Sequence, residues 1–303
     1  MRRVRDLLEF AGVKLVDFLL NRLSWRAAQE VGALLGGAAR HLAPRRWAMT
    51  VSNLEHAFPD WPPARREATA LEAWQNAGRI GAEMIRSRSL SKAELEKVVI
   101  FEKAEMVDAL IAEGRGIIFN IGHLGNWEVG GIAFTAHGWP LGVVGRVMKN
   151  PLLEGWIRET RGRFGETVFA HRNPFFSLVK WLKSGKLTAI LIDHNLYQGG
   201  IFVPFFGRPA ATSTLSGLLS AKLNCPIVSV RVYRDGARLR VRFEGPLRPD
   251  PAANPEREAE RLTVEMTKTL EGYIRERPGE WLWGHNRWKR TAEAPVAETG
   301  KKI

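Results

Sequence analysis

The order of hydrophobic and polar residues divides the chain into two parts. In the first part, apolar residues recur every three or four positions, which is the spacing of one face of an α-helix. This pattern predicts helices over residues 4–19, 24–58 and 63–86, with a proline-rich turn before the third. We therefore predict an N-terminal helical region over residues 1–95.

From residue 96 onward, short apolar runs alternate with helical patterns, which is typical of an α/β fold with a mostly parallel central sheet flanked by helices. The turn Arg234-Asp235-Gly236 between the last two runs predicts a hairpin at the end of this sheet. The α/β core is predicted over residues 96–290, and residues 291–303 are predicted to be a flexible tail. The predicted strands are 116–121, 141–145, 166–169, 187–193, 226–233 and 237–244, and the predicted helices are 126–137, 151–163, 175–185, 213–223 and 255–277.

The first helical segment is amphipathic, with Arg5, Asp6, Glu9 and Asp17 mostly away from its apolar face. Its acidic residues interrupt the apolar stretch that a cleavable signal needs. The cleanest apolar run nearby, residues 31–39, is too short to cross a bilayer. We therefore expect no conventional transmembrane span. The helix could either lie in a membrane interface or pack on the domain.

Composition and charge narrow the choice of partner. The chain has 303 residues with 45% hydrophobic and 25% charged content, which fits a globular protein with a substantial core. A net charge of +13 attracts anions such as nucleic acid, acidic lipid or an acidic protein. The eleven Trp residues favour a membrane interface. The sequence has no Lys/Arg-rich block with interleaved aromatic residues, which argues against nucleic-acid binding. Cys225 is the only cysteine and is expected to be a small core residue, so a cytosolic environment is the simplest inference.

The stretch NIGHLGNWE follows a predicted strand, and it contains the first candidate chemistry. His123 would lie at the carboxyl end of the strand, where sites of α/β folds gather. Asn126 is a good helix N-cap, which puts Glu128 in the first turn. If the chain turns at Gly122 and Gly125, the imidazole and the carboxylate can meet and form a general base. The alternative is a capped helix with a histidine nearby by chance.

Several segments together resemble a known family. HLGNWE matches the H-x4-D/E motif of glycerolipid acyltransferases, and its setting resembles the bacterial lipid A biosynthesis acyltransferases, which add secondary lauroyl or myristoyl groups. The resemblance covers about residues 25–290. Its further segments, in the family's order, are NLEHAFPD (53–60), GRVMKNPLLEGWIRETRGRFG (145–165), DHNLYQGGIFVPFFGRPAATSTL (193–215) and PGEWLWGHNRWK (278–289).

The resemblance implies an O-acyl transfer. His123 is then the general base and Glu128 its partner in a dyad, and the family's aspartate corresponds to Asp193. An acyl thioester on acyl carrier protein or CoA would react with a hydroxyl of a membrane glycolipid, such as a lipid A precursor. No cofactor and no metal are implied. Asp193 and His194 could instead join the dyad as metal ligands, although the spacing does not match H-E-x-x-H.

Four arginines after the second predicted strand are candidate substrate ligands. The family's essential arginine corresponds to Arg161, with Arg158 and Arg163 as neighbouring candidates. Arg146 occupies the position of a motif arginine, but Gly145 and Val147 replace the Tyr and Pro around it. Arginine suits bidentate phosphate contacts. The alternative for each of them is a solvated helix face.

The aromatic residues near the C-terminus leave several interpretations open. Phe202, Phe205 and Phe206 border an acyl groove, touch the bilayer or fill the core. Trp281, Trp283 and Trp288 form either an interfacial belt or part of the core. The resemblance implies a peripheral or monotopic enzyme on the cytoplasmic face of the bacterial inner membrane. Its expected partners are acyl carrier protein, anionic lipids and a glycolipid acceptor, and no nucleic acid. Phosphatidylinositol mannosides and ornithine lipids are alternative acceptors. A non-catalytic basic protein that binds membranes or nucleic acid is the alternative of another class.

Overall fold

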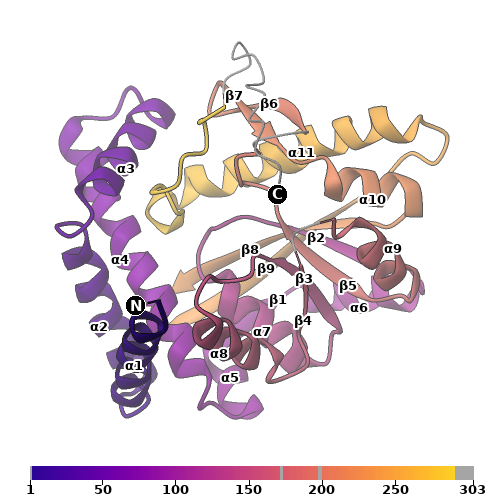
Figure 1. Cartoon of the computed structure of the whole chain (residues 1–303). Coiled ribbons are helices and arrows are strands. Elements are labelled where there is room, and N and C mark those ends of the chain that lie inside the picture. Colours follow the sequence, from indigo (N-terminus) through magenta and orange to yellow (C-terminus); the bar gives the residue numbers. More distant parts are fainter. Residues whose placement is uncertain (1, 171–172, 197–199, 291–303) are drawn as a thin grey trace.

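The structure is a computed structural model that describes residues 2–170, 173–196 and 200–290. Figure 1 shows the N-terminal helices, in indigo and violet, beside a central sheet with helices on both of its faces. The predicted α/β class, the mostly parallel sheet and the helical N-terminal region are confirmed. The predicted tail over residues 291–303 lies outside the described ranges.

The N-terminal region contains one helix more than its pattern predicts. The predicted helix over 24–58 is in fact two helices, because Pro44 has no backbone N–H and fits the first turn of a helix better than its interior. Its four helices are α1 (Arg2–Leu20), α2 (Trp25–Ala39), α3 (Pro44–Ala57) and α4 (Pro63–Ser87).

The glycine-rich run of α2 is a close-packing surface for α4. A Cβ atom on Gly78 of α4 would lie only 2.0 Å from the carbonyl oxygen of Gly32, and one on Gly36 would lie 2.3 Å from the carbonyl oxygen of Trp74. Only glycine permits this approach of two helix backbones. The short apolar run over residues 31–39 therefore packs α2 against α4.

Seven strands form the central sheet in the order β1-β9-β8-β2-β5-β3-β4. The pairs β2–β5, β2–β8, β3–β5, β3–β4 and β1–β9 are parallel, and β8–β9 is the predicted hairpin. The strands are β1 (Val99–Glu102), β2 (Ile117–Ile121), β3 (Leu141–Gly145), β4 (Thr167–Ala170), β5 (Leu187–Leu191), β8 (Ile227–Asp235) and β9 (Arg238–Leu247).

Helices cover both faces of the sheet, and β2 shows how its alternating side chains serve two cores. Ile118 packs with α9, α10 and α11, whereas Ile117 and Phe119 pack with α5, α6 and α7. The helices of the core are α5 (Lys92–Val98), α6 (Ala104–Ala112), α7 (Trp127–His137), α8 (Pro151–Gly162), α9 (Phe175–Lys183), α10 (Leu215–Leu223), α11 (Pro255–Glu276) and the 3-10 turn η1 (Pro278–Glu280).

The sequence patterns missed several short elements. Helices α5 and α6 and the four-residue strand β1 are too short to show a clear periodic pattern of hydrophobic residues. A second hairpin, β6 (Ile201–Phe205) with β7 (Arg208–Thr212), lies between residues 193 and 213, where no strand is predicted, and it contains Pro204 and Pro209. Phe205 and Phe206 of this hairpin are buried, so core packing accounts for both.

Candidate active site

The parallel register of β2 and β5 brings His123 and Asp193 together. Ile121 and Leu191, the last residues of the two strands, are paired directly. Each of the two polar residues follows two positions after its strand. Because the carboxyl ends of parallel strands meet at one edge of the sheet, their side chains meet there.

The Asp193 carboxylate holds His123 in two ways. Its Oδ1 lies 2.8 Å from the Nδ1 of His123, and its Oδ2 accepts a hydrogen bond of 2.8 Å from the backbone N–H of His123. The indole N–H of Trp281 donates to the same Oδ2 at 2.8 Å. The carboxylate is fully buried. The imidazole is therefore fixed in both position and ring orientation.

The charges of this pair stabilise each other. Burial opposes ionisation of Asp193, but His123 and its hydrogen bonds outweigh burial and lower the pKa of this carboxyl. Burial also opposes protonation of His123, but Asp193, followed by Glu128, raises the pKa of the imidazole above its usual value. An ionised carboxylate can only accept hydrogen bonds, so Nδ1 of His123 carries the proton. The lone pair of a neutral His123 is then on Nε2, as a general base requires.

Aromatic rings surround the imidazole. Trp127 and His194 contact His123 edge to face, with ring centroids 4.7 and 4.5 Å away. Burial and the nearby His123 lower the pKa of His194 to about 4, so His194 is neutral at pH 7. The ring of His285 contacts the backbone carbonyl of Asp193 through Nε2, at 2.9 Å. His194 and His285 therefore add polar contacts but no positive charge beside the base, since burial lowers the pKa of His285 as well.

The C-terminal Trp-rich segment holds the loop of His123. The backbone N–H of Leu282 donates to the carbonyl of His123 at 3.0 Å, and the N–H of Gly125 donates to the carbonyl of Glu280 at 3.0 Å. Gly125 has φ of +61°, and a Cβ there would lie 1.8 Å from a β8 carbonyl oxygen. Trp281 and Trp283 are fully buried. The segment is thus part of the core that shapes the site, and the interfacial-belt interpretation is wrong for these two residues.

A buried ion pair joins the N-terminal helices to the start of α7. Arg234 of β8 pairs with the fully buried Glu83 of α4 through both carboxylate oxygens. The side chain of Asn126 donates to the same carboxylate at 2.6 Å, and its oxygen caps α7 by accepting from the N–H of Val129. The predicted N-cap at Asn126 is confirmed. The loop of His123 is therefore fixed from the N-terminal region as well.

Glu128 does not supply the carboxylate that hydrogen-bonds His123; Asp193 does. Instead, Glu128 accepts two hydrogen bonds from Arg161, from Nε at 2.9 Å and from Nη2 at 2.7 Å. His123 belongs to the loop before α7, whereas Glu128 lies in the first turn of that helix, where Arg161 engages it. Glu128 is still close enough to raise the pKa of His123 through its charge.

Arg161 also lies beside a second buried acid. Its Nε is 3.9 Å from the carboxyl of Glu166, which precedes β4. Burial, the dominant cause, raises the pKa of Glu166 to about 8, although Arg161 opposes this shift. Glu166 is therefore mostly a neutral carboxylic acid at pH 7. The pKa of Arg161 itself is raised, because Glu128 outweighs the effect of burial.

An apolar pocket lies between α7 and the sheet, next to this cluster. It extends from the last residues of β2 and β5, Ile121 and Leu191, to the first residue of β3, Leu141. Leu141 is level with Leu187, four positions before Leu191, which corresponds to roughly 13 Å along the strand. The polar side chains in its wall are those of Trp127, Glu128, Arg161 and Glu166. Since Trp127 also contacts His123, the pocket adjoins the base.

The remaining arginines do not converge on the site. Arg146 is exposed in the loop after β3. Arg158 is exposed and contacts Glu154 on the same helix at 3.4 Å. Arg163 donates to the backbone carbonyl of Ser87 at 2.7 Å. Of the four arginines predicted as ligands, only Arg161 lines the pocket.

The contacts of Trp281 and Glu166 were not predicted. Trp281 lies far from His123 in the sequence, and no local pattern indicates that its indole reaches Asp193. Glu166 precedes a short strand and looks like an ordinary surface acid. The pairing of His123 with Asp193, in contrast, could have been predicted, because both follow strands that end at one edge. Among the described residues, no group of His, Cys, Asp and Glu side chains is arranged to hold a metal ion.

Known protein families and relatives match this chain over most of its length. The family model described as bacterial lipid A biosynthesis acyltransferase matches residues 2–290. A lipid A biosynthesis acyltransferase of Haemophilus influenzae is 26% identical over 271 residues, 89% of this chain and 82% of that protein. The lipid A biosynthesis lauroyltransferase of Escherichia coli is 24% identical over 283 residues, 92% of this chain and 90% of that protein.

A more distant relative acts on a different acceptor. The phosphatidylinositol mannoside acyltransferase of Mycobacterium tuberculosis is 22% identical over 205 residues, 65% of this chain and 64% of that protein. The family model spans nearly all of the chain. The chain therefore belongs to the bacterial lipid A biosynthesis acyltransferase family, and it is an acyltransferase.

Proposed function

We propose that the enzyme transfers a fatty acyl group from an acyl thioester to a hydroxyl of a lipid A precursor, with His123 as general base and Asp193 as its partner. The observation that carries this proposal is the imidazole fixed by a buried, ionised carboxylate at the sheet edge, next to an apolar pocket. No nucleophilic side chain is needed, because the acceptor hydroxyl itself attacks.

In the proposed reaction, His123 takes a proton from the acceptor hydroxyl and later gives it to the leaving thiolate. Nε2 of His123 removes the proton of the acceptor hydroxyl while its oxygen attacks the thioester carbon. The imidazolium that forms is stabilised by Asp193. When the tetrahedral intermediate collapses, the carbon–sulfur bond breaks, and the imidazolium returns its proton to the leaving thiolate. The products are an ester and a free thiol, and the enzyme is unchanged.

Glu128 and Arg161 act beside the base. Glu128 occupies two donors of Arg161 and fixes its guanidinium, which leaves further N–H groups for an oxyanion or a phosphate. An oxyanion donor is worth about 3–4 kcal/mol in known enzymes. Glu128 also favours the protonated form of His123 through its charge. Its role is therefore to organise Arg161 and the local field.

The apolar pocket is the proposed site of the acyl chain. Its walls come from the middle of the sheet and from α7 and are mostly apolar, which suits a hydrocarbon chain. The net charge of +13 favours an acidic acyl carrier protein as donor and an anionic membrane as the source of the acceptor. We place the enzyme on the cytoplasmic face of the inner membrane, where such a carrier is available.

The decisive experiment replaces the base. His123→Ala should lower transfer from acyl carrier protein or CoA to a lipid A precursor by about 10²–10⁴-fold, the usual contribution of a general base. His137→Ala is the matched control, because His137 is the exposed last residue of α7. Undiminished transfer by the His123 variant would remove the catalytic assignment.

The acceptor requires a separate measurement. A related enzyme acylates phosphatidylinositol mannosides, and the same catalytic group would serve that acceptor. Mass spectrometry of lipids from a strain without this enzyme should show a lipid A species lighter by one acyl group. A changed mannoside or ornithine lipid with unchanged lipid A would keep the reaction and refute the acceptor.

A further inference from the structure

The side of helix α1 that faces the protein carries two buried aspartates, whereas most of its large apolar residues face outward. An ordinary surface helix turns its apolar residues toward the core. In α1, Asp6 and Asp17 are buried, at 8% and 9% exposure, whereas Leu8 and Leu15 are 68% and 60% exposed. The other large apolar residues exposed on this helix are Val4, Leu7, Val16, Phe18 and Leu19. Only the end of the helix, at Leu20, joins an apolar cluster of α2 and α4.

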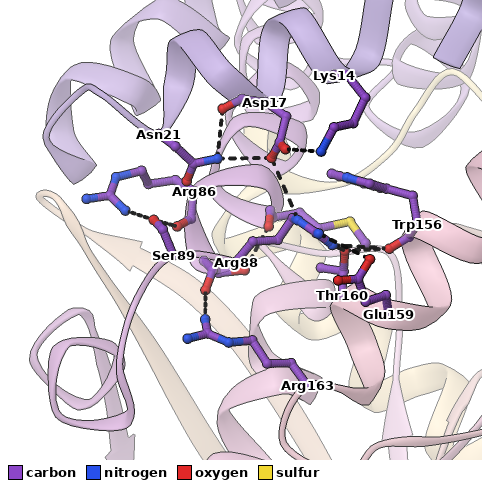
Figure 2. A network of polar contacts seen from close by, with 12 residues as sticks. Lys14, Asp17, Asn21, Arg86, Arg88, Ser89, Trp156, Glu159, Thr160 and Arg163 are labelled. Carbon is purple, nitrogen blue, oxygen red and sulfur yellow. Dashed lines mark hydrogen bonds and ion pairs between the residues drawn. The ribbon is translucent and has the colours of Figure 1, made fainter. Parts of the chain in front are cut away.

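The buried side of α1 is connected to α8 by Arg88. Figure 2 shows Arg88, which follows α4, between Asp17 and the side chains of α8. Its guanidinium lies 3.7 Å from Oδ1 of Asp17 and 3.4 Å from the carboxylate of Glu159. It also donates to the hydroxyl of Thr160 and contacts the ring of Trp156. Thr160 is the residue before the pocket arginine.

A second connection lies at the other end of both helices. Asn150, the N-cap of α8, donates from its side chain to the backbone carbonyl of Asp6 at 2.9 Å and to the carboxylate of Glu9 at 3.0 Å. Thus α1 is attached to α8 near both of its ends. Because α8 carries Arg161, these contacts link α1 to the pocket wall.

Basic residues lie on and beside α1 among its exposed apolar residues: Arg3, Arg5, Lys14 and Arg22 are exposed, and Arg22 lies over the ring of Phe18. Arg5 also contacts Asp6 and Glu9, and Lys14 contacts Asp17. Asp17 is turned toward Arg88, and Glu9 toward Asn150. Among the described residues, no helix combines the length and hydropathy that crossing a bilayer requires.

The apolar surface continues toward the edge of the sheet that holds His123. Val147, Met148 and Leu152, around the start of α8, are exposed next to α1. They follow β3, which is parallel to β5, so the loop leaves the sheet at the same edge as Asp193. A flat ligand that covers α1 would therefore also cover the border of the site.

We propose that the outward face of α1, together with residues 147–152, is a docking surface for an anionic lipid bilayer, mounted on α8 through Asp17 and Arg88. Leucine, phenylalanine and flanking arginine side chains suit the boundary between headgroups and acyl chains. The mount holds the docking helix and the pocket arginine as one unit, so the docked enzyme presents the site edge to lipid.

A second copy of the chain is the alternative occupant of this surface. Two copies would bring together surfaces that are both positively charged, on molecules with a net charge of +13 each. Charge complementarity therefore favours anionic lipid. Light scattering separates the two: the bilayer proposal expects a monomer in solution that retains vesicle binding, and a stable dimer that does not bind vesicles would overturn it.

The docking face is tested with a pair of charged substitutions. The double variant Leu8→Glu/Leu15→Glu should bind vesicles of phosphatidylglycerol and phosphatidylethanolamine at least tenfold more weakly than the unchanged enzyme. Val264→Glu is the matched control, because Val264 is an exposed apolar residue of α11, and Figure 1 places α11 away from α1. Equal binding by the double variant and the control would overturn the proposal.

The mount is tested by Arg88→Gln, and this test alone rests on the proposed function. The variant should keep its vesicle affinity but transfer acyl groups to an acceptor in vesicles at least fivefold more slowly, with transfer in detergent micelles changed less than twofold. Arg86→Gln is the control, because Arg86 contacts Leu23 and Ser89 and not α8. If the Arg88 variant does not fold, Asp17→Asn replaces it. Unchanged vesicle transfer would refute the mount.

The two proposals fail separately. Vesicle binding needs no turnover, so His123→Ala should bind vesicles like the unchanged enzyme. If that variant retained acyl transfer, the catalytic assignment would fail while the docking result stood. If it lost transfer but the double variant of α1 still bound vesicles, the docking surface would fail alone.

Discussion

Asp193 and Glu166 are two buried carboxyl groups with opposite pKa shifts. Asp193 lies at the carboxyl edge of the sheet and has a lowered pKa, whereas Glu166 lies before β4 and has a pKa raised to about 8. Burial disfavours the charged form of both. What differs is the number of partners. Asp193 accepts from the backbone and ring of His123 and from Trp281. Glu166 has Arg161 at 3.9 Å, and that arginine is already engaged by Glu128.

The comparison shows that the partners of a buried acid, and not its depth, decide whether it is ionised. At Asp193 the charge of His123 and the hydrogen bonds from its ring and backbone outweigh burial, whereas the one shared cation beside Glu166 does not. Asp193 can therefore orient and charge-stabilise an imidazole. Glu166, as a mostly neutral carboxylic acid, can line an apolar pocket without placing a charge in it. The experiments below test this division of roles.

The largest effect is expected when the ionised acid is made neutral. Asp193→Asn presents an amide to Nδ1 of His123, which favours the wrong tautomer, and transfer should fall by about 10³–10⁴-fold. Asp193 also raises the pKa of His123. Since the base acts when neutral, the rising limb of the pH–rate profile should move to lower pH in any residual activity. A profile with an unchanged limb would contradict the pairing.

The raised pKa of Glu166 should make the free energy of unfolding depend on pH. The folded-state pKa of Glu166 is about 8, above its ordinary 4.5, so the folded protein holds a proton that the unfolded chain has lost between these values. Its contribution to stability is full below pH 4.5 and is lost as pH rises toward 8. The Glu166→Gln variant has no carboxyl group to titrate and does not lose this stability. The free energy of unfolding of the variant minus that of the unchanged protein should therefore increase by on the order of 4 kcal/mol between pH 5 and 9.

Urea unfolding of both proteins at the two pH values measures that difference. Glu113→Gln is the control, because the exposed Glu113 has a lowered pKa and does not titrate in this range. A constant difference between the Glu166 variant and the unchanged protein would show that Glu166 is ionised throughout, and the comparison with Asp193 would lose its basis.

Regular patterns of the sequence predicted the larger elements because their periods are local properties. The strands β2, β3 and β5 and the helix from Asn126 agree with the predicted ranges within a few residues. Pro44 was overlooked as a helix breaker, and the hairpin β6–β7, which contains two prolines, was not predicted. Strand β1 has only four residues, and its place beside β9 depends on contacts distant in sequence.

The site was predicted in its residue types but not in its pairings. His123, Glu128, Arg161 and Asp193 are all at the site. The partner of His123 was assigned to the acid nearest in sequence, although strand register brings Asp193 to it. The contribution of Trp281 depends on how the C-terminal segment folds back. Such contacts follow from tertiary packing, and no spacing within one segment encodes them.

A smaller effect is expected from the acid that binds Arg161. Glu128→Gln keeps one acceptor but removes the charge that fixes the guanidinium, so transfer should fall about 10–100-fold, in the range of a lost charged hydrogen bond. Vesicle binding should be unchanged. The control is Glu113→Gln, which breaks a bidentate pair with Arg248 on the surface. A loss of vesicle binding without a loss of transfer would contradict this role.

The smallest effect should come from the indole donor of Asp193. Trp281→Phe keeps an aromatic ring in a fully buried position but removes the 2.8 Å hydrogen bond to the carboxylate. Two donors from His123 remain, so transfer should fall only about three- to tenfold, as expected for one hydrogen bond to a charged group. Trp283→Phe is the matched control, because Trp283 is equally buried but donates to the carbonyl of Pro278. If both variants lose the same activity, packing explains the loss. If only the Trp281 variant loses activity, the indole hydrogen bond to Asp193 contributes to transfer beyond packing, a contact for which Glu166 has no counterpart among its described partners.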